Sequence, residues 1–168
     1  KPDTSILAKT GHFYFGLTGR LGKLDPRRRN AYTKGSPIQN SPMSTQTFDP
    51  AAEILEEIRE GRLVIVVDDG DRENEGDLVM AASFATPEHI NFMAKEGRGI
   101  ICIPMEGHRL DELGLHPMVS PSQDPMKTAW AVSVDAKEGV TTGISAHDRA
   151  RTIQVLINQH SQPEDVVR

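Results

Sequence analysis

The chain has 168 residues, of which 37% are hydrophobic and 26% charged, so it can form a globular domain with a core and is not of disordered type. It contains no apolar run long enough to span a bilayer and no apolar segment of signal-peptide type near its start. A single cysteine, Cys102, excludes an intrachain disulfide and favours a reducing cytoplasm, and the net charge of -5 gives no reason to expect nucleic acid.

Residues 1–42 differ from the rest of the chain in charge. They hold eight basic and two acidic residues, whereas residues 43–168 hold eleven basic and 22 acidic ones. The first segment also lacks a sustained helix or strand period, and the stretch from Met43 reads like a natural protein start. We predict a disordered leader or upstream sequence at 1–42 and a folded domain at 43–168, with a basic nucleic-acid arm as the less favoured interpretation of the leader.

The folded part opens with a helix signal. Asp49 is typical of an N-cap, and Pro50 of the first helical position. Ile54, Leu55 and Ile58 form an apolar stripe at helical spacing. We therefore predict a helix that starts here and ends before the next glycine.

Helix and strand patterns then alternate along the chain. Ser145 and Asp148 stand three residues apart, which is the spacing of a capping box at the start of a helix. After the first helix we predict strands at 63–67 and 78–82, a helix at 86–96, a strand at 99–105, a helix at 106–113, a strand at 129–135, and a last helix from 145 to about 160. This order predicts an α/β or α+β fold with a largely buried sheet.

The segment 68–77 reads DDGDRENEGD and holds six carboxylates and one cation. Carboxylates packed this closely repel one another unless a cation is present, and such oxygen ligands suit Mg²⁺ or Mn²⁺. Where the segment is extended, Glu73, Glu75 and Asp77 lie on one side, and Arg72 is placed to clamp a phosphate.

A solvated acidic hairpin turn is the alternative interpretation of this segment, and charge alone favours it. The position after a buried strand favours a ligand site instead, because ligands of open α/β sheets bind beyond the carboxyl ends of strands. A calcium EF-hand does not fit, since Asn74 and Met80 stand where that loop needs Gly and Glu.

A second segment, EGVTTGISAHDR at 138–149, is a Gly/Thr loop that leads into a helix N-terminus, where amides and hydroxyls can receive an anion or sugar hydroxyls. It lacks the Gly-Lys-Ser/Thr of a P-loop. Thr141 and Thr142 could equally satisfy turn hydrogen bonds, and Asp148 and Arg149 could form only a cap and a surface ion pair. Cys102 lies in an apolar run, where a packed, inert thiol is the default, and the six histidines lack zinc-site spacing.

Three stretches, VVDDGDRENEGDLVMAA, GRGIICIPM and EGVTTGISAHDRARTI, together resemble the N-terminal part of the 3,4-dihydroxy-2-butanone 4-phosphate synthase family over about 51–168. The DDxDRENEGD stretch is very specific for it. The resemblance implies an α/β (α+β) fold with a mixed-sheet sandwich, and a cytoplasmic homodimer with active sites near the subunit interface. It also implies a Mg²⁺- (or Mn²⁺-) dependent lyase of riboflavin biosynthesis that converts ribulose 5-phosphate to 3,4-dihydroxy-2-butanone 4-phosphate and formate.

Matched by position, the resemblance implies roles for eight residues. Glu73 matches the glutamate that binds the metal and the substrate. The others match substrate contacts, proton-transfer groups or the pocket edge: Arg72 and Asp77 (substrate, with Asp77 also in proton transfer), Glu75 (secondary acid or base), Cys102 (pocket edge), Thr142 (substrate), and Asp148 and Arg149 (pocket motif).

The family pattern continues beyond residue 168 with a Pro-Gly-His segment, an Arg-x-Gly-His-Thr-Glu segment that brings the second metal ligand, and a later glutamate. We therefore expect these 168 residues to be a fragment, truncated at the C-terminus and with little or no lyase activity alone. The alternative is a short, non-catalytic chain that binds a divalent cation or a partner through the acidic segment. Whether a GTP cyclohydrolase II domain follows is open at this stage.

Overall fold

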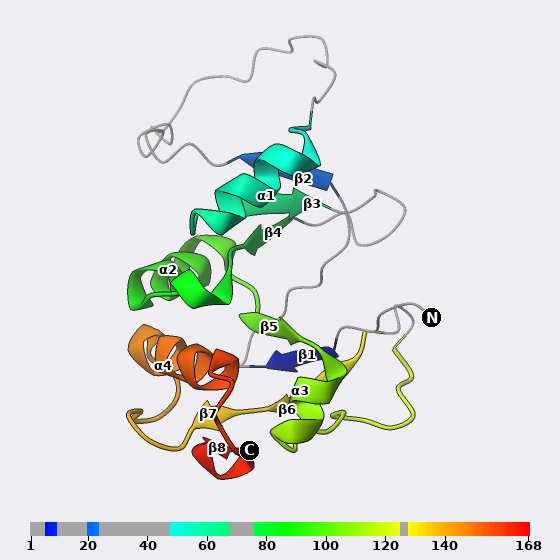
Figure 1. Cartoon of the computed structure of the whole chain (residues 1–168), viewed down its shortest axis with the longest axis vertical. Helices are drawn as coiled ribbons and strands as arrows, with labels where there is room; N and C mark the ends of the chain where they lie inside the picture. The colour runs from blue at the N-terminus through cyan, green and yellow to red at the C-terminus, as the bar shows by residue number, and fades with distance from the viewer. Residues whose placement is uncertain (1–5, 10–19, 24–47, 68–75, 125–127) are drawn as a thin grey trace. The chain divides into compact units, whose positions relative to one another are not determined.

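The computed structural model describes residues 48–67, 76–124 and 128–168, and the backbone of residues 6–9 and 20–23. The chain divides into two compact units, one formed by residues 17–79 and the other by residues 1–16 and 80–168. Figure 1 shows their helices and strands. The described helices and strands together form an α+β fold, as the sequence predicts.

The unit of residues 17–79 is a helix packed on a three-stranded antiparallel sheet. Its elements are β2 (Arg20–Lys23), α1 (Ala51–Arg59), β3 (Val64–Val67) and β4 (Gly76–Val79). The strand order is β2-β3-β4, and both pairings are antiparallel. Ile54 of α1 is fully buried and packs with Val64 and Val66 of β3, which fixes the helix on one face of the sheet.

Helix α1 begins one residue later than predicted. Pro50 occupies the N-cap position with φ -59° and ψ 137°, and no side chain caps the helix, so the predicted Asp49 cap is wrong. Leu55 is 50% exposed and lies outside the buried stripe. Gly61, at φ 76°, follows the helix end as predicted, because glycine accepts this left-handed conformation without strain.

The second unit carries most of the elements. They are β1 (Ile6–Lys9), the 3₁₀ turn η2 (Ala82–Phe84), α2 (Pro87–Phe92), the π turn η3 (Met93–Gly97), β5 (Cys102–Met105), α3 (Gly107–Glu112), β6 (Trp130–Ser133), β7 (Asp135–Ala136), α4 (Ala146–Ile157), the 3₁₀ turn η4 (Pro163–Asp165) and β8 (Val166–Val167). Strand β1 lies between β5, to which it is antiparallel, and β6, to which it is parallel, so this small sheet is mixed. Strands β7 and β8 form a separate antiparallel pair.

Helix α4 organises the core of this unit. It packs against α2 and β7, and its buried face joins one cluster of apolar side chains from the surrounding elements. The largest fully buried members of that cluster are Ile90, Leu110, Leu113, Leu115 and Leu156. The loop before α4 is therefore attached to a helix whose inner face is buried in the core.

Local signals located the helices of this unit better than its strands. Thr86 caps α2 and accepts a hydrogen bond from the His89 amide at 3.4 Å, and Gly114 follows α3 at φ 63°. The strands are shorter than predicted: β4 ends at Val79 instead of residue 82, and β5 begins at Cys102 instead of residue 99. The last helix ends at Ile157.

Strands β1 and β2 lie within the segment predicted as a leader, where the sequence analysis expects no element. Each is four residues long, which is too short to give a periodic pattern. The two compact units meet in sequence at 16/17 and 79/80 and not at residue 42. The role of residues 1–42 as a leader remains a prediction.

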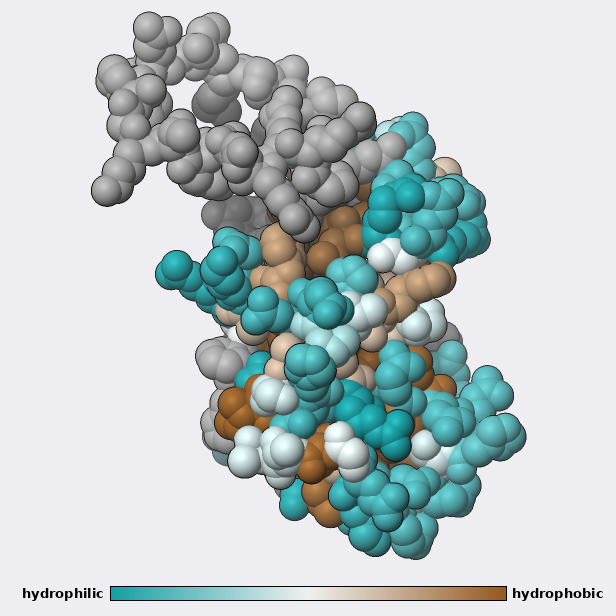
Figure 2. Space-filling view, turned by 90° about the vertical axis from the view of Figure 1, so that its left-hand side faces the viewer, coloured by the Kyte–Doolittle hydropathy of each residue, from teal (hydrophilic) through white to brown (hydrophobic). Residues whose placement is uncertain are grey.

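The face seen in Figure 2 carries mostly polar residues, with apolar residues exposed between them. Exposed large apolar side chains include Phe84, Phe92, Val119 and Ile144, of which Val119 and Ile144 are more than 60% exposed. Among the described residues, no helix combines the length and apolar character that a membrane crossing needs.

Candidate functional site

The eight predicted site residues fall into three groups. Arg72, Glu73 and Glu75 lie outside the described residues. Asp77 belongs to the unit of residues 17–79, and the remaining four belong to the other unit: Cys102, Thr142, Asp148 and Arg149. Of these four, the structure brings the last three together at the loop before α4.

Asp77 is a buried carboxyl group on β4. It is 6% exposed and stands opposite Val66, while Val79, two residues along, stands opposite Val64. Directly opposite residues of an antiparallel pair share one face, so Asp77 lies on the apolar face that packs against α1. Burying a carboxyl group among apolar side chains costs free energy. This cost marks Asp77 as a candidate functional residue.

Residues 68–75 join two antiparallel strands, because Val67 at the end of β3 pairs with Gly76 at the start of β4. The sequence argument compared this position with the ligand sites of open α/β sheets, whereas β3 and β4 form an antiparallel hairpin, so that comparison does not apply to this segment. What remains is its composition, which is rich in the oxygen ligands that Mg²⁺ and Mn²⁺ prefer, with the buried Asp77 carboxyl directly after it.

The carboxylate of Asp148 holds the loop that precedes α4. Asp148 is 4% exposed and accepts three hydrogen bonds: from the Thr141 amide at 3.2 Å, the Thr141 hydroxyl at 2.8 Å and the Gly143 amide at 3.1 Å. These bonds, the one from the Thr141 hydroxyl foremost, hold the pKa of the Asp148 carboxyl below its ordinary value, although burial opposes the shift. The Asp148 carboxylate is thus an anion whose oxygens face hydrogen-bond donors of the loop.

The loop itself depends on two glycines and one arginine. Gly139 and Gly143 have φ of 80° and 77°, a region that L side chains rarely adopt. The Arg151 guanidinium donates from Nε to the Glu138 carbonyl at 3.3 Å and so ties the start of the loop to α4. Thr142, between these anchors, is exposed.

A second carboxyl group, Asp135 on β7, lies on the other side of Gly143. Burial raises its pKa, the nearby Asp148 carboxylate raises it further, and the Arg149 guanidinium lowers it. Arg149 is 5% exposed, so this cation is buried beside two acids. Asp135 is missing from the predicted site residues, because a single Asp at the start of the two-residue strand β7 gives no sequence signal.

The structure corrects two predictions for this region, the capping box and the surface ion pair. The Ser145 hydroxyl accepts from the Asp148 amide at 3.0 Å, but the Asp148 carboxylate binds the preceding loop, so the S-x-x-D pattern forms only half of the predicted capping box. The surface ion pair proposed for Asp148 and Arg149 is also wrong, because both residues are buried.

Cys102 begins β5 and is partly exposed. It stands opposite Lys9 of β1 in the antiparallel register. The apolar neighbours Ile101 and Ile103 are 8% and 5% exposed, so the thiol sits at the edge of the buried core rather than inside it. This position is less enclosed than the packed thiol that the sequence favours.

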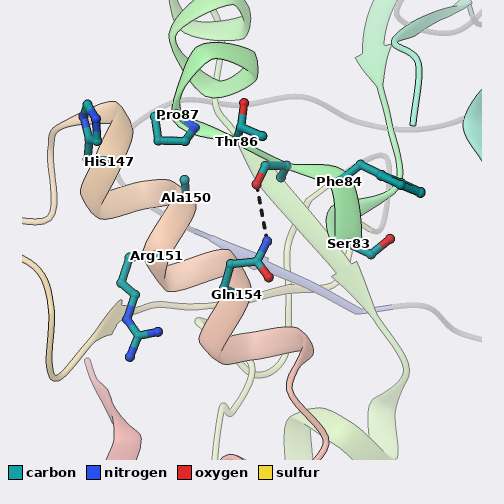
Figure 3. A pocket seen from close by; sticks show the side chains of 9 residues that line it. Ser83, Phe84, Thr86, Pro87, His147, Ala150, Arg151 and Gln154 are labelled. Carbon is teal, nitrogen blue, oxygen red and sulfur yellow. Dashed lines mark hydrogen bonds between the residues drawn. The ribbon is translucent and has the colours of Figure 1, made fainter. Parts of the chain in front are cut away.

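An open pocket of about 530 Å³ lies between α4 and the segment that runs from η2 to the start of α2 (Figure 3). Its walls come from η2, the start of α2, and α4: Ser83, Phe84, Ala85, Thr86, Pro87, His147, Ala150, Arg151 and Gln154. The Gln154 amide crosses its floor and donates to the Ala85 carbonyl at 3.3 Å. Arg151 therefore borders both this pocket and the loop before α4.

Within the described residues, no three acidic, histidine or cysteine side chains gather as a metal site would require. The predicted metal ligand, Glu73, lies outside those residues.

Comparison with known proteins identifies the region that carries these features. The family model described as 3,4-dihydroxy-2-butanone 4-phosphate synthase matches residues 52–168. The riboflavin biosynthesis protein RibBA of Aquifex aeolicus is 56% identical over 123 residues, which are 72% of this chain and 30% of that protein. The 3,4-dihydroxy-2-butanone 4-phosphate synthase of Neisseria meningitidis serogroup B is 50% identical over 121 residues, 72% of this chain and 33% of that protein.

A solved structure gives the same result. The crystal structure of a 3,4-dihydroxy-2-butanone 4-phosphate synthase in complex with two magnesium ions superimposes with a TM-score of 0.66 at 38% identity, and the match covers 72% of this chain and 56% of the other. The chain spans about a third of the length of these two curated relatives.

Proposed function

The chain belongs to the 3,4-dihydroxy-2-butanone 4-phosphate synthase family, and we propose that its protein converts D-ribulose 5-phosphate to L-3,4-dihydroxy-2-butanone 4-phosphate and formate in riboflavin biosynthesis. The observation that carries the proposal is the matched region, which includes both the acidic segment 68–77 and the Asp148-anchored loop. Identities of 50% and 56% to named relatives support it.

The acidic segment is proposed to hold a divalent cation, Mg²⁺ or Mn²⁺, through Glu73. Its carboxylate density fits a hard cation, and a related protein carries magnesium in its crystal structure. When bound, the ion supplies an electrophile that polarises carbonyl and hydroxyl oxygens of the sugar. Arg72 is assigned to substrate binding, since a guanidinium fits phosphate or carboxylate oxygens bidentately.

Asp77 is proposed to move a proton to or from the substrate carbon chain, with Glu75 as a second acid or base. Enolisation of a ketose needs a base that is held close to the reacting carbon. The buried position of Asp77 supports this role, because a carboxylate shielded from bulk water exchanges a proton with the substrate rather than with solvent.

Three further residues are proposed to contact the substrate or to line its pocket. Thr142, which is exposed, is assigned a hydrogen bond to a sugar oxygen. Arg149 is assigned a positive charge near the substrate, and Cys102 is assigned to the pocket edge. Asp148, assigned to the same pocket, shapes the loop that carries Thr142.

We further infer the assembly that this function implies: a cytoplasmic homodimer whose complete fold is a mixed-sheet sandwich. The parallel and antiparallel pairings of β1 support a mixed sheet. The single cysteine supports a reducing compartment.

Formate release from ribulose 5-phosphate tests the proposal. The full-length gene product is expected to release formate with Mg²⁺ and to stop when EDTA removes the metal. Glu73→Gln keeps the size of the side chain and removes its charge, so it is expected to abolish metal-dependent turnover. Glu56→Gln, an exposed glutamate paired with Arg59 on α1, is the matched control and is expected to retain activity.

The competing function is cation or partner binding without catalysis. It predicts Mg²⁺ binding by calorimetry in a folded, full-length protein that releases no formate. That result would set the lyase aside and leave the acidic segment as a binding element.

A further inference from the structure

We propose that Asp148 is a positioning residue, whose carboxylate ties residues 141–143 to the first turn of α4 and thereby presents Thr142 to the sugar phosphate. This role rests on the proposed function and deepens it, because it assigns to Asp148 the shape of the binding loop rather than a contact with the ligand.

The hydrogen bonds of the Asp148 carboxylate all come from the loop that precedes α4. Oδ1 accepts from the Thr141 amide, and Oδ2 accepts from the Thr141 hydroxyl and the Gly143 amide, at 2.8 to 3.2 Å. The residue is 4% exposed, so hydrogen bonds from the loop take the place of water around its carboxylate. An anion satisfied in this way has little capacity left for a ligand.

The backbone donors to Asp148 lie on both sides of Thr142. The two amides that bind Asp148 belong to Thr141 and Gly143, the residues directly before and after Thr142. These bonds hold the peptides between residues 140 and 141 and between residues 142 and 143, and the Thr142 side chain between them is exposed. The carboxylate thus determines where the Thr142 hydroxyl lies.

The part of α4 that carries Asp148 is buried and hydrogen-bonded to β7. Thr152, fully buried one helical turn later, donates to the Asp148 carbonyl at 3.0 Å and accepts from the Ala136 amide of β7 at 3.0 Å. Asp135 of the same strand closes the space behind Gly143. The loop is therefore held against α4 and β7, and removal of the carboxylate is expected to release it.

The test uses the full-length protein and a pair of nearly isosteric changes. Thr141→Val removes the hydroxyl that donates to Oδ2 and keeps the side-chain shape, whereas Thr141→Ser keeps the hydroxyl. Loss of one hydrogen bond to a carboxylate is expected to lower kcat/KM on the order of tenfold in Thr141→Val, and Thr141→Ser is expected to restore it. Asp148→Asn is expected to lose more, because an amide nitrogen faces the loop donors.

Ser145→Ala is the matched control. It removes the hydroxyl that caps the Asp148 amide at 3.0 Å, so it weakens the same helix end without touching the loop bonds. Its unfolding midpoint is expected to fall as much as that of Thr141→Val, while its kcat/KM stays within about twofold of wild type. Hydrogen exchange of the loop amides is expected to rise in Thr141→Val and Asp148→Asn only.

The outcomes separate the two proposals. If wild-type protein releases formate and Thr141→Val matches Ser145→Ala in kcat/KM and in loop exchange, the positioning role is overturned and the proposed function stands. If folded wild-type protein releases no formate, the proposed function fails and the positioning role falls with it.

Discussion

The carboxyl group of Asp135 lies directly against the α-carbon of Gly143. A Cβ atom built at residue 143 would come 2.2 Å from Asp135 Oδ2, which is closer than real Cβ contacts reach. The same glycine has φ 77° and donates its amide to Asp148 at 3.1 Å. Backbone conformation and packing thus both require glycine at this position, and the amide hydrogen bond to Asp148 excludes proline.

Gly143→Ala is expected to destabilise the protein. The left-handed φ alone costs on the order of 1–3 kcal/mol for a residue with a Cβ, and the contact with Asp135 adds to it. Urea unfolding of the full-length protein measures the change. Gly107→Ala, within helix α3, is the control and is expected to be neutral or slightly stabilising. Equal midpoints for the two variants would show that the loop adapts to a side chain.

Thr152→Val is expected to cost about 1–3 kcal/mol of stability, because it leaves the buried Ala136 amide without its acceptor while the volume is unchanged. Thr142→Val makes the same chemical change at an exposed residue and is expected to stay within about 0.5 kcal/mol of wild type. Its formate release is expected to fall instead. The prediction fails if Thr142→Val unfolds as early as Thr152→Val.

Asp135 and Asp148 are expected to make the free energy of unfolding depend on pH in opposite directions. The folded pKa of Asp135 is raised, chiefly by burial, so its ionised form opposes folding at neutral pH, and this penalty disappears as pH falls through the folded pKa. Asp135→Asn is therefore expected to stabilise the protein at neutral pH and to lose that advantage in acid.

Asp148 behaves in the reverse sense. Hydrogen bonds from the loop lower its folded pKa, so its stabilisation is present above the unfolded pKa and is lost as pH falls through the folded one. Asp148→Asn is expected to destabilise at neutral pH, with the difference shrinking in acid. Urea unfolding between about pH 3 and pH 8 measures both curves, with the exposed Asp111→Asn on α3 as control. Parallel curves for the two variants would contradict the assigned environments.

Sequence reasoning succeeded at this site where the signal is local. Thr86 and Ser145 cap their helices as predicted, since an N-cap bond spans only three residues. The pattern at Asp148 was ambiguous because a carboxylate in the first turn can bond either the N-cap amide or the preceding loop. Only the fold of residues 141–143 decides between them, and that fold depends on packing by Asp135.

The sequence also did not show which side chains of the unit of residues 17–79 are buried. The alternation of Glu73, Glu75 and Asp77 placed them on one side of an extended segment without telling which side faces the core. The register of β4 on β3 resolves this for Asp77. In α1, helical spacing grouped Leu55 with Ile54 and Ile58, but a face built on four-residue strands buries only Ile54 fully, and Ile58 in part.

Helix α1 therefore offers a direct measure of how narrow the buried stripe is. Ile54 is fully buried against Val64 and Val66, so Ile54→Ala is expected to cost about 2–5 kcal/mol through lost burial and the cavity left behind. Leu55 is 50% exposed, so Leu55→Ala removes side-chain atoms that largely contact water and is expected to stay within about 1 kcal/mol of wild type. Urea unfolding compares the two, and equal losses would mean that α1 buries Leu55 against a surface of the full-length protein outside its own unit.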